Sequence, residues 1–409
     1  MIRPIAVLVC LPLVAVGAPA TDSTVHQTVL TRPRPETDPQ GMRLGAFELN
    51  AALSTGYLLD DNIFATDTDE VDDDILLVKP EAVLASGWSR HALRVGAEAL
   101  IGRYRDIDSE DYDDYRVFTD GRLDLRGSKV SGALSYADLH EPRTSPDDEG
   151  GAEPTTYSLV AADLAWLYQP GALSIRPDVR FRSFSFDDQP LAPPQGDRDR
   201  DTLDFGLRVG YDITPESDLF IEGRVTQVDY DQKVDDDGFQ RSSDGYEVIG
   251  GSTLDLGGKT FGEVYAGYRS WSFEDSRFED IDGLAFGADL AWNVTGLTTL
   301  TVSVSSTIES TTIVDASGIQ RTAIGLDVDH ELRRNLLLYV RAARANEDFQ
   351  GIDRDDELFD GSFGARYLMN RHFYIQAGVT QEKRDTSGAE SNDQAYDIHR
   401  FEISLQGNL

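Results

Sequence analysis

From Phe47 to Leu409 the sequence repeats, about every twenty residues, a stretch in which apolar and polar side chains alternate. In one such stretch, one face has Leu93, Val95, Ala97, Ala99 and Ile101, and the other has Arg94, Glu98 and Gly102. Side chains on a strand have a period of two, so each stretch predicts a strand with one lipid-compatible face and one wet face. Many such strands in succession, with no helical segment between them, favour a closed barrel without free edges over a soluble sandwich.

The connections between these predicted strands are by turns short and long. Eight short ones are rich in Gly, Pro, Asn and Ser, as hairpin turns are, for example Pro170-Gly171 and Thr295-Gly296. Nine longer ones are acidic, for example residues 141–154 and 231–244. The predicted fold is therefore an all-β, transmembrane, antiparallel up-and-down β-barrel of about 18 strands, with 16 as the alternative count. Its short turns are expected to face the periplasm, and its long acidic loops the exterior.

The N-terminus predicts a targeting segment. Residues 1–20 contain Arg3, an apolar run and an Ala18-Pro19-Ala20 cleavage site, as a secretory signal peptide does. The only cysteine, Cys10, falls inside it, so the mature chain is expected to have neither a disulfide nor a reactive thiol. Residues 21–43 predict a flexible periplasmic tail, and residues 44–409 the barrel. The expected location is the outer membrane of a Gram-negative bacterium.

The net charge is −36, which excludes a nucleic-acid-binding protein on electrostatic grounds. The acidic residues gather in the predicted loops, for example Asp235-Asp236-Asp237. One interpretation is solubility and mutual repulsion of neighbouring molecules. The other is that divalent cations bridge these carboxylates to anionic sugars and phosphates of lipopolysaccharide. A dedicated calcium loop is not expected, because Lys233 stands where such a loop needs an acid.

Charges of both signs fall on the predicted inward faces. The candidate pore-lining residues are Arg116, Arg122, Arg126, Arg176, Arg180, Arg182, Arg208, Asp120, Asp124, Asp178 and Asp204. These side chains can form a structural lattice of ion pairs, in which each pair offsets the cost of desolvation. They can equally line a water-filled channel, in which fixed arginines favour anionic solutes while the acidic mouth opposes them. The sequence leaves both interpretations open.

Aromatic residues recur near the predicted strand ends. They are Tyr57, Trp88, Tyr104, Tyr136, Trp166, Tyr168, Trp271, Trp292 and Tyr367. Transmembrane barrels place aromatic girdles at both membrane interfaces, so we expect this role in preference to sugar stacking.

No enzyme, catalytic residue, metal site or cofactor is expected. His330-Glu331 resembles the start of a zinc-protease motif, but Arg334 stands where the second histidine is needed. His140, beside the third acidic loop, is the one tempting catalytic candidate. We expect it to be a solvent-exposed histidine at a strand end, because no partner is positioned for it.

The first predicted hairpin contains four distinctive segments, which are Gly56 to Phe64, Val78-Lys79-Pro80, Trp88-Ser89-Arg90-His91 and Tyr104-Arg105. In these segments the chain resembles the putative β-barrel porin 2 family of outer-membrane proteins. The family typically has a Tyr-x-Asp-Asn-Ile segment, a proline in the second strand and a W-S-R-H-like turn. This chain departs from that pattern by the extra Leu58-Leu59 between the tyrosine and the acids.

The resemblance implies an outer-membrane barrel, in some members encoded with machinery for exopolysaccharide synthesis and export. We therefore expect a passive conduit or a component of exopolysaccharide export, with polysaccharide export components as partners. The alternative is a structural barrel with a closed lumen that contacts surface polysaccharide or lipopolysaccharide. Lipids, lipopolysaccharide and the barrel assembly machinery are the other expected partners. The expected assembly signal is the alternating C-terminal segment, with Phe401, Ile403, Leu405 and Leu409.

Overall fold

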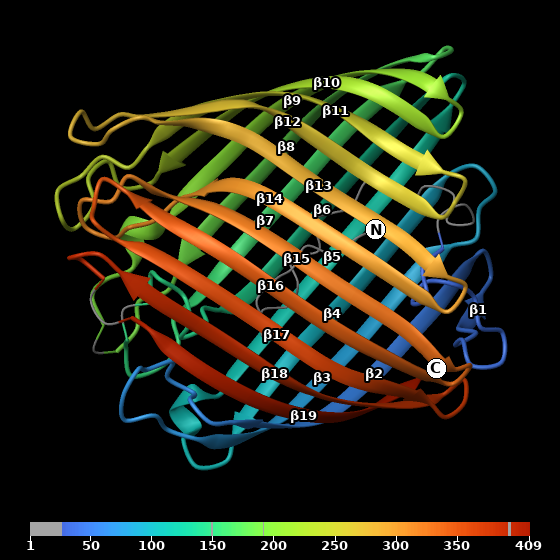
Figure 1. The fold of residues 1–409 in the computed structure, drawn as a ribbon, viewed down its shortest axis with the longest axis horizontal. Helices are drawn as coiled ribbons and strands as arrows, with labels where there is room; N and C mark the ends of the chain where they lie inside the picture. The colour runs from blue at the N-terminus through green and yellow to red at the C-terminus, as the bar shows by residue number, and fades with distance from the viewer. Residues whose placement is uncertain (1–26, 149, 191, 392–393) are drawn as a thin grey trace.

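A computed structural model describes residues 27–148, 150–190, 192–391 and 394–409, so the predicted signal peptide lies outside the described residues. Within these ranges, eighteen long strands form one antiparallel sheet in which each strand pairs with its neighbours in sequence, and the last strand pairs with the first (Figure 1). The closed sheet confirms the predicted all-β barrel and its strand count.

The barrel strands are slightly longer than a membrane-spanning strand requires. They are β2 (Phe47–Asp60), β3 (Asp73–Ser86), β4 (Ala92–Tyr104), β5 (Tyr112–Leu125), β6 (Ser128–His140), β7 (Thr156–Tyr168), β8 (Leu173–Phe186), β9 (Arg200–Thr214), β10 (Ser217–Tyr230), β11 (Ser243–Leu256), β12 (Thr260–Phe273), β13 (Ile281–Thr295), β14 (Thr298–Glu309), β15 (Gly318–Arg333), β16 (Leu336–Gln350), β17 (Asp355–Leu368), β18 (Phe373–Ser387) and β19 (Tyr396–Asn408). The short connections lie together at one end of the barrel, and the long acidic ones at the other (Figure 1). We call these the turn end and the loop end. Two single turns of 3₁₀-helix, η1 (Asp108–Glu110) and η2 (Gly196–Arg198), interrupt the loops.

The two faces of the wall differ as the alternation predicts. Large apolar side chains on the outer face are open to the surroundings, for example Leu164, Phe205 and Leu284, which are 57%, 50% and 69% exposed. On the inner face, glycines make room for charged partners. A Cβ at Gly206 would lie 2.6 Å from Asp178 Oδ1 and 2.7 Å from an Arg224 Nη atom. A side chain at position 206 would therefore displace an ion pair between the two adjacent strands.

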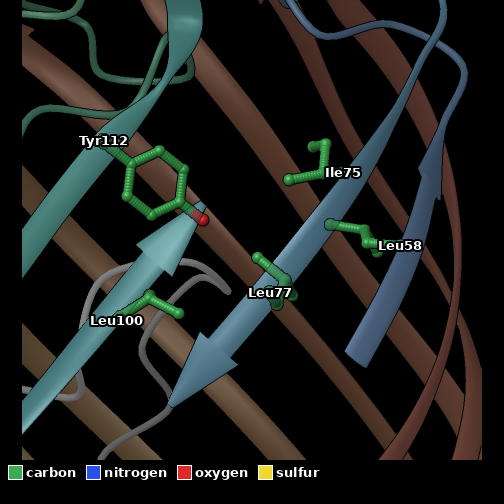
Figure 2. Packing of buried hydrophobic residues seen from close by; sticks show 5 residues of the cluster. All are labelled: Leu58, Ile75, Leu77, Leu100 and Tyr112. Atoms are coloured by element: carbon green, nitrogen blue, oxygen red, sulfur yellow. The ribbon is translucent and has the colours of Figure 1, made fainter. Parts of the chain in front are cut away.

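Apolar side chains on the inner face gather near the loop end. One buried cluster consists of Leu58, Ile75, Leu77, Leu100 and Tyr112, which come from the four consecutive strands β2 to β5 (Figure 2). A second consists of Ala137, Leu139 and Leu159 on β6 and β7. Burying such side chains is worth about 1.5–3 kcal/mol each, so the loops that cover them have an apolar surface on which to pack.

Seven of the nine aromatic residues expected in the girdles have the outward placement that such a role requires, and two do not. Tyr57, Trp88, Tyr136, Trp166, Tyr168, Trp292 and Tyr367 are exposed outer-face side chains, between 38% and 47% exposed. Tyr104 instead packs against the buried cluster of β2 to β5. Trp271 lies on the inner face, where its ring fills the space beside Gly245. Both have the register of inward residues, so the girdle prediction is wrong for these two.

A short strand, β1 (Met42–Leu44), pairs with the start of β2 through a tight turn at Gly45, whose φ is 65°. It belongs to the segment predicted as a flexible tail, and that flexibility stays a prediction. Among the described residues no helix is long and apolar enough to cross a membrane.

Candidate functional site: the lumen and its two mouths

The inner wall brings together most of the predicted pore-lining residues. Arg116, Asp120, Arg122 and Asp124 share the inner face of β5, and Arg176, Asp178, Arg180 and Arg182 share that of β8. Asp204 and Arg208 lie beside the latter group on β9. Arg126 is the exception, because it lies beyond the end of β5, in the short turn to β6, where it is exposed. Its placement on a wall strand is therefore corrected.

The arginines of β8 to β10 form a lattice with carboxylates. Asp178 lies 3.0 Å from an Arg224 nitrogen and 3.4 Å from Arg180 Nε. Glu222 accepts hydrogen bonds from Arg208 at 2.7 Å and from Arg224 at 2.8 Å, and Arg208 also reaches Glu263 at 2.8 Å. Shared carboxylates fix the positions of these guanidinium groups, so this part of the wall is an ordered, nearly neutral array.

Further ion pairs join neighbouring strands. Arg94 pairs with Asp120, Arg116 with Glu98, and Arg182 with Asp163, at 2.9, 3.2 and 3.0 Å. Arg94 and Glu98 were placed on the wet face from the sequence but not nominated as pore-lining, and the sequence interpretation missed Asp163, Glu222, Arg224 and Glu263. Their strand register, the same as that of the nominated residues, was a sufficient signal.

Arg176 differs from the other nominated arginines. It faces inward on β8 opposite Arg208, and within the described part of the chain it makes no ion pair or hydrogen bond. An uncompensated guanidinium on a wet wall is free to meet an anionic group of a solute.

Residues 141–148, which we call the strap, cross the mouth at the loop end. The strap begins directly after β6, at the loop end of that strand. Its Asp147 Oδ1 accepts hydrogen bonds from Thr311 Oγ1 at 2.6 Å and from the Thr312 amide at 3.2 Å. Thr311 and Thr312 lie in the loop between β14 and β15. Six strands on one side and eight on the other separate the β6–β7 pair from the β14–β15 pair, so the strap and the β14–β15 loop together bridge nearly opposite sides of the barrel.

Buried ion pairs fix the strap. Glu141 accepts bonds from both Arg198 Nη atoms, at 2.7 and 2.9 Å, and Arg143 forms a similar pair with Glu110, at 2.7 and 3.0 Å. Arg143 also reaches Asp148, at 3.3 Å. Burial dominates over that attraction and raises the pKa of the Asp148 carboxyl to about 6, with Glu141 adding to the effect. Asp148 is therefore the carboxylate of the strap whose charged form is destabilised by burial.

The loop that receives the strap is itself tied down. The Arg241 side chain, 3% exposed, pairs with Asp235 at 2.6 Å. Its two Nη atoms donate to four backbone oxygens of the β14–β15 loop, those of Thr311, Thr312, Ile313 and Ala316. Nearby, the Arg277 guanidinium and the Gln240 amide hold the pKa of the Asp275 carboxyl well below its usual range. The anchor for the strap is thus a hydrogen-bonded loop and not a free one.

Residues 27–41, which we call the tail segment, cross part of the mouth at the turn end. The Val29 amide donates to Thr299 Oγ1 at 2.9 Å, and Val29 is only 2% exposed. Arg32 and Arg34 both pair with Glu331, the latter at 3.1 Å, and Arg371 donates to the Pro35 oxygen at 3.1 Å. The tail segment therefore contacts the wall from β13, where Asn293 donates to the Gln27 oxygen, to the turn between β17 and β18.

His140 is buried and not exposed as expected. It is 5% exposed, stacks on Tyr112 with ring centroids 3.9 Å apart, and its Nδ1 lies 2.8 Å from Asp114 Oδ1. No serine or threonine hydroxyl bonds to its ring within the described residues. The same part of the chain contains no group of three or more His, Cys, Asp or Glu side chains that could hold a metal ion.

Several solved structures are similar to this barrel. The outer membrane protein OpdK of Pseudomonas aeruginosa has 12% sequence identity and a TM-score of 0.45, covering 89% of this chain and 99% of that one. OccK2 (OpdF) of the same organism, solved with glucuronate, has 13% identity and a TM-score of 0.49, covering 90% and 100%. The siderophore receptor PirA of Acinetobacter baumannii has 7% identity and a TM-score of 0.47, covering 88% and 80%. None of the curated proteins compared with this sequence matches it.

A family model gives a firmer assignment than these structures do. The model described as Putative beta-barrel porin 2 matches residues 34–406, which is nearly all of the barrel. The match extends far beyond the first hairpin, where the sequence motifs of the resemblance lie. The chain therefore belongs to the Putative beta-barrel porin 2 family and is a porin-like β-barrel of the outer-membrane type.

Proposed function

We propose that this protein is a passive channel for small polar solutes. The observation that supports the proposal is the contrast between the two faces of a closed 18-strand wall, apolar outside and charged inside. Barrels of this strand number enclose an aqueous lumen. The strap narrows one mouth and the tail segment part of the other, so the solutes are small.

The lumen wall chemistry suggests how charged solutes are distinguished. Most inward arginines are neutralised by carboxylates, whereas Arg176 has no such partner within the described residues. Arg180, 43% exposed, shares Asp178 with Arg224. These two side chains are therefore the better candidates for contact with anionic groups than Arg122 and Arg182, which are each paired at 3.0 Å.

The experiment is single-channel recording of the refolded protein in a planar bilayer, with and without anionic oligosaccharides. Discrete conductance steps that oligosaccharides leave unblocked are expected. Neutralising Arg176 and Arg180 should change the ion selectivity more than neutralising Arg122 and Arg182. Block by oligosaccharides would instead favour the glycan conduit that the family resemblance implies, for which neither the family description nor the lumen gives support.

A closed-lumen barrel is the second candidate, because segments of the chain cross both mouths. Such a barrel would act through its acidic loops, which divalent cations could bridge to lipopolysaccharide. The absence of channel conductance in the bilayer at all applied voltages would favour the closed-lumen barrel. Attachment to lipopolysaccharide that chelators do not weaken would then argue against the cation bridges.

For assembly, we infer that the last strand meets the barrel assembly machinery. Phe401, Ile403 and Leu405 form an apolar outer-face row on β19, each between 41% and 46% exposed, and Leu409 follows it. Crosslinking to the assembly machinery from these positions, lost when Phe401 and Leu405 are replaced by serine, tests this role.

A further inference from the structure

The inner wall of β13 to β17 contains carboxylates that the lattice of β8 to β10 does not balance. Asp289 on β13 is exposed and has no hydrogen bond or ion pair within the described residues. Asp327 on β15 reaches Arg341 only at 3.7 Å. Asp329 Oδ1 and Asp360 Oδ2 are buried without a hydrogen-bond partner among the described residues, and Asp329 as a whole is only 7% exposed.

Nearby cations do not compensate this charge. Arg341 is the one guanidinium within ion-pair distance of these four carboxylates in the described part of the chain, and it is 46% exposed. Arg366 is turned to Gln376 Oε1, which accepts its bonds at 3.0 and 2.9 Å. Even counting both arginines, four carboxylates against two cations leave an excess of two negative charges on this wall.

The register places Asp327 between two of the other carboxylates, because Asp329 is two residues away on β15 and Asp360 lies two strands and two residues away on β17. Asp327 pairs with Arg341 and Asp329 with Tyr339 across β15 and β16, and Ala343 pairs with Asp360 across β16 and β17. The Arg341 guanidinium lies 4.9 Å from the Tyr339 ring centroid. An aromatic face beside carboxylates is the environment that attracts organic cations.

We propose that this wall binds small organic cations, with an ammonium group held by Asp327 together with either Asp329 or Asp360. The inference rests on the proposed channel function and adds the class of solute. A metal ion is a poorer ligand here, because it needs carboxylates that converge within about 2.0–2.6 Å of one point, whereas a bulky ammonium interacts with a spread set of charges. Among the described residues no convergent set of metal ligands exists.

The first measurement is the reversal potential of single channels in a KCl gradient. We expect potassium to permeate about threefold more readily than chloride, which is the scale of screened attraction to exposed charges. The triple variant D327N/D329N/D360N should bring this ratio close to one. The matched control is D348N/E357Q/D385N, which removes three carboxylates from the outer face of β16, β17 and β18 and should leave the ratio unchanged.

The second measurement is direct binding of choline to the detergent-solubilised protein, by calorimetry. Choline should bind, its uncharged isostere 3,3-dimethylbutan-1-ol should not, and the lumen triple variant should weaken choline binding at least about threefold. If that variant does not fold, the single change D289N at an exposed position should still lower the potassium preference.

The two measurements separate the two proposals. Choline binding without any conductance contradicts the channel but keeps the cation site. Three outcomes would overturn the cation site and keep the channel. The channel conducts without preferring potassium, the protein does not bind choline, or the lumen variant and the outer-face control lose the potassium preference equally.

Discussion

Arg384 on β18 donates a hydrogen bond from Nη2 to the backbone oxygen of Thr144, at 2.7 Å, and so ties the far wall of the barrel to the strap. Arg384 is 3% exposed and lies 3.6 Å from Asp356, which also forms an ion pair with Arg354. Together with the Asp147–Thr311 bond, this contact ties the strap to two distant parts of the wall, in addition to its ion pairs with η1 and η2 in the neighbouring loops. The strap is therefore a fixed crossbar of the loop-end mouth.

Removing one attachment should free the strap. In D147A the bonds from Thr311 and Thr312 are lost, about 1–3 kcal/mol, which raises the population of detached strap by about 5- to 150-fold. Single-channel recordings should show larger or more variable conductance. D67A, at an exposed position of another loop, is the control. Identical recordings for D147A and the unmodified protein would mean that the strap does not narrow the mouth.

Asp148 should make the strap sensitive to pH. Its pKa is raised from 3.8 to about 6, so between these values the folded loop holds more protons than the unfolded one. The resulting stabilisation is complete below about 3.8 and is lost as pH rises through 6. Hydrogen exchange of residues 141–148 should therefore show stronger protection at acidic than at neutral pH, after correction for the intrinsic rate. D148N should remove the difference, and an unaltered profile in D148N would contradict this account.

Glu222 should be important for barrel stability. It is shared by Arg208 and Arg224, and E222Q leaves both guanidinium groups with weaker partners in a part of the wall where their side chains are 20% and 12% exposed. We expect a loss of about 3–5 kcal/mol, measured by urea unfolding in detergent micelles. E357Q breaks a pair whose partners are 64% and 54% exposed, so it should cost less than about 1 kcal/mol. Equal losses in the two variants would show that the lattice is not a stabilising unit.

The tail segment should be held by Glu331. Because the predicted mature chain has no cysteine, a V29C variant reports on this contact through its rate of reaction with maleimide. Val29 is buried, so labelling should be slow. Adding E331Q weakens the bonds to Arg32 and Arg34, by about 1.5–3 kcal/mol, and should speed labelling about tenfold or more. No acceleration would mean that other contacts hold the segment.

The fold was predictable because its signals are local. Alternation within each strand and the composition of each turn depend on residues a few positions apart, and hairpins then fix which strands pair. The same register placed Arg180 and Asp178 on one face, and it would have excluded Trp271, two residues from inward Arg269, from the girdle. Asp147 and Thr311, by contrast, are 164 residues apart, and no local pattern links them. The burial of His140 has the same cause, because Glu110 and residues 141–144, which line a pocket with it, belong to connections whose path the sequence does not specify.

The pairing of β19 with β2 means that the barrel can close only after its last strand has been translated. A message cut short before Tyr396 leaves β2 and β18 with rows of backbone amides and carbonyls that no neighbour satisfies, and hydrocarbon offers them nothing in exchange. A smaller barrel is not available by simple re-pairing, because seventeen strands would bring β2 and β18 together in parallel. A stop codon in the loop before Tyr396 should therefore yield degraded chains and not a narrower pore.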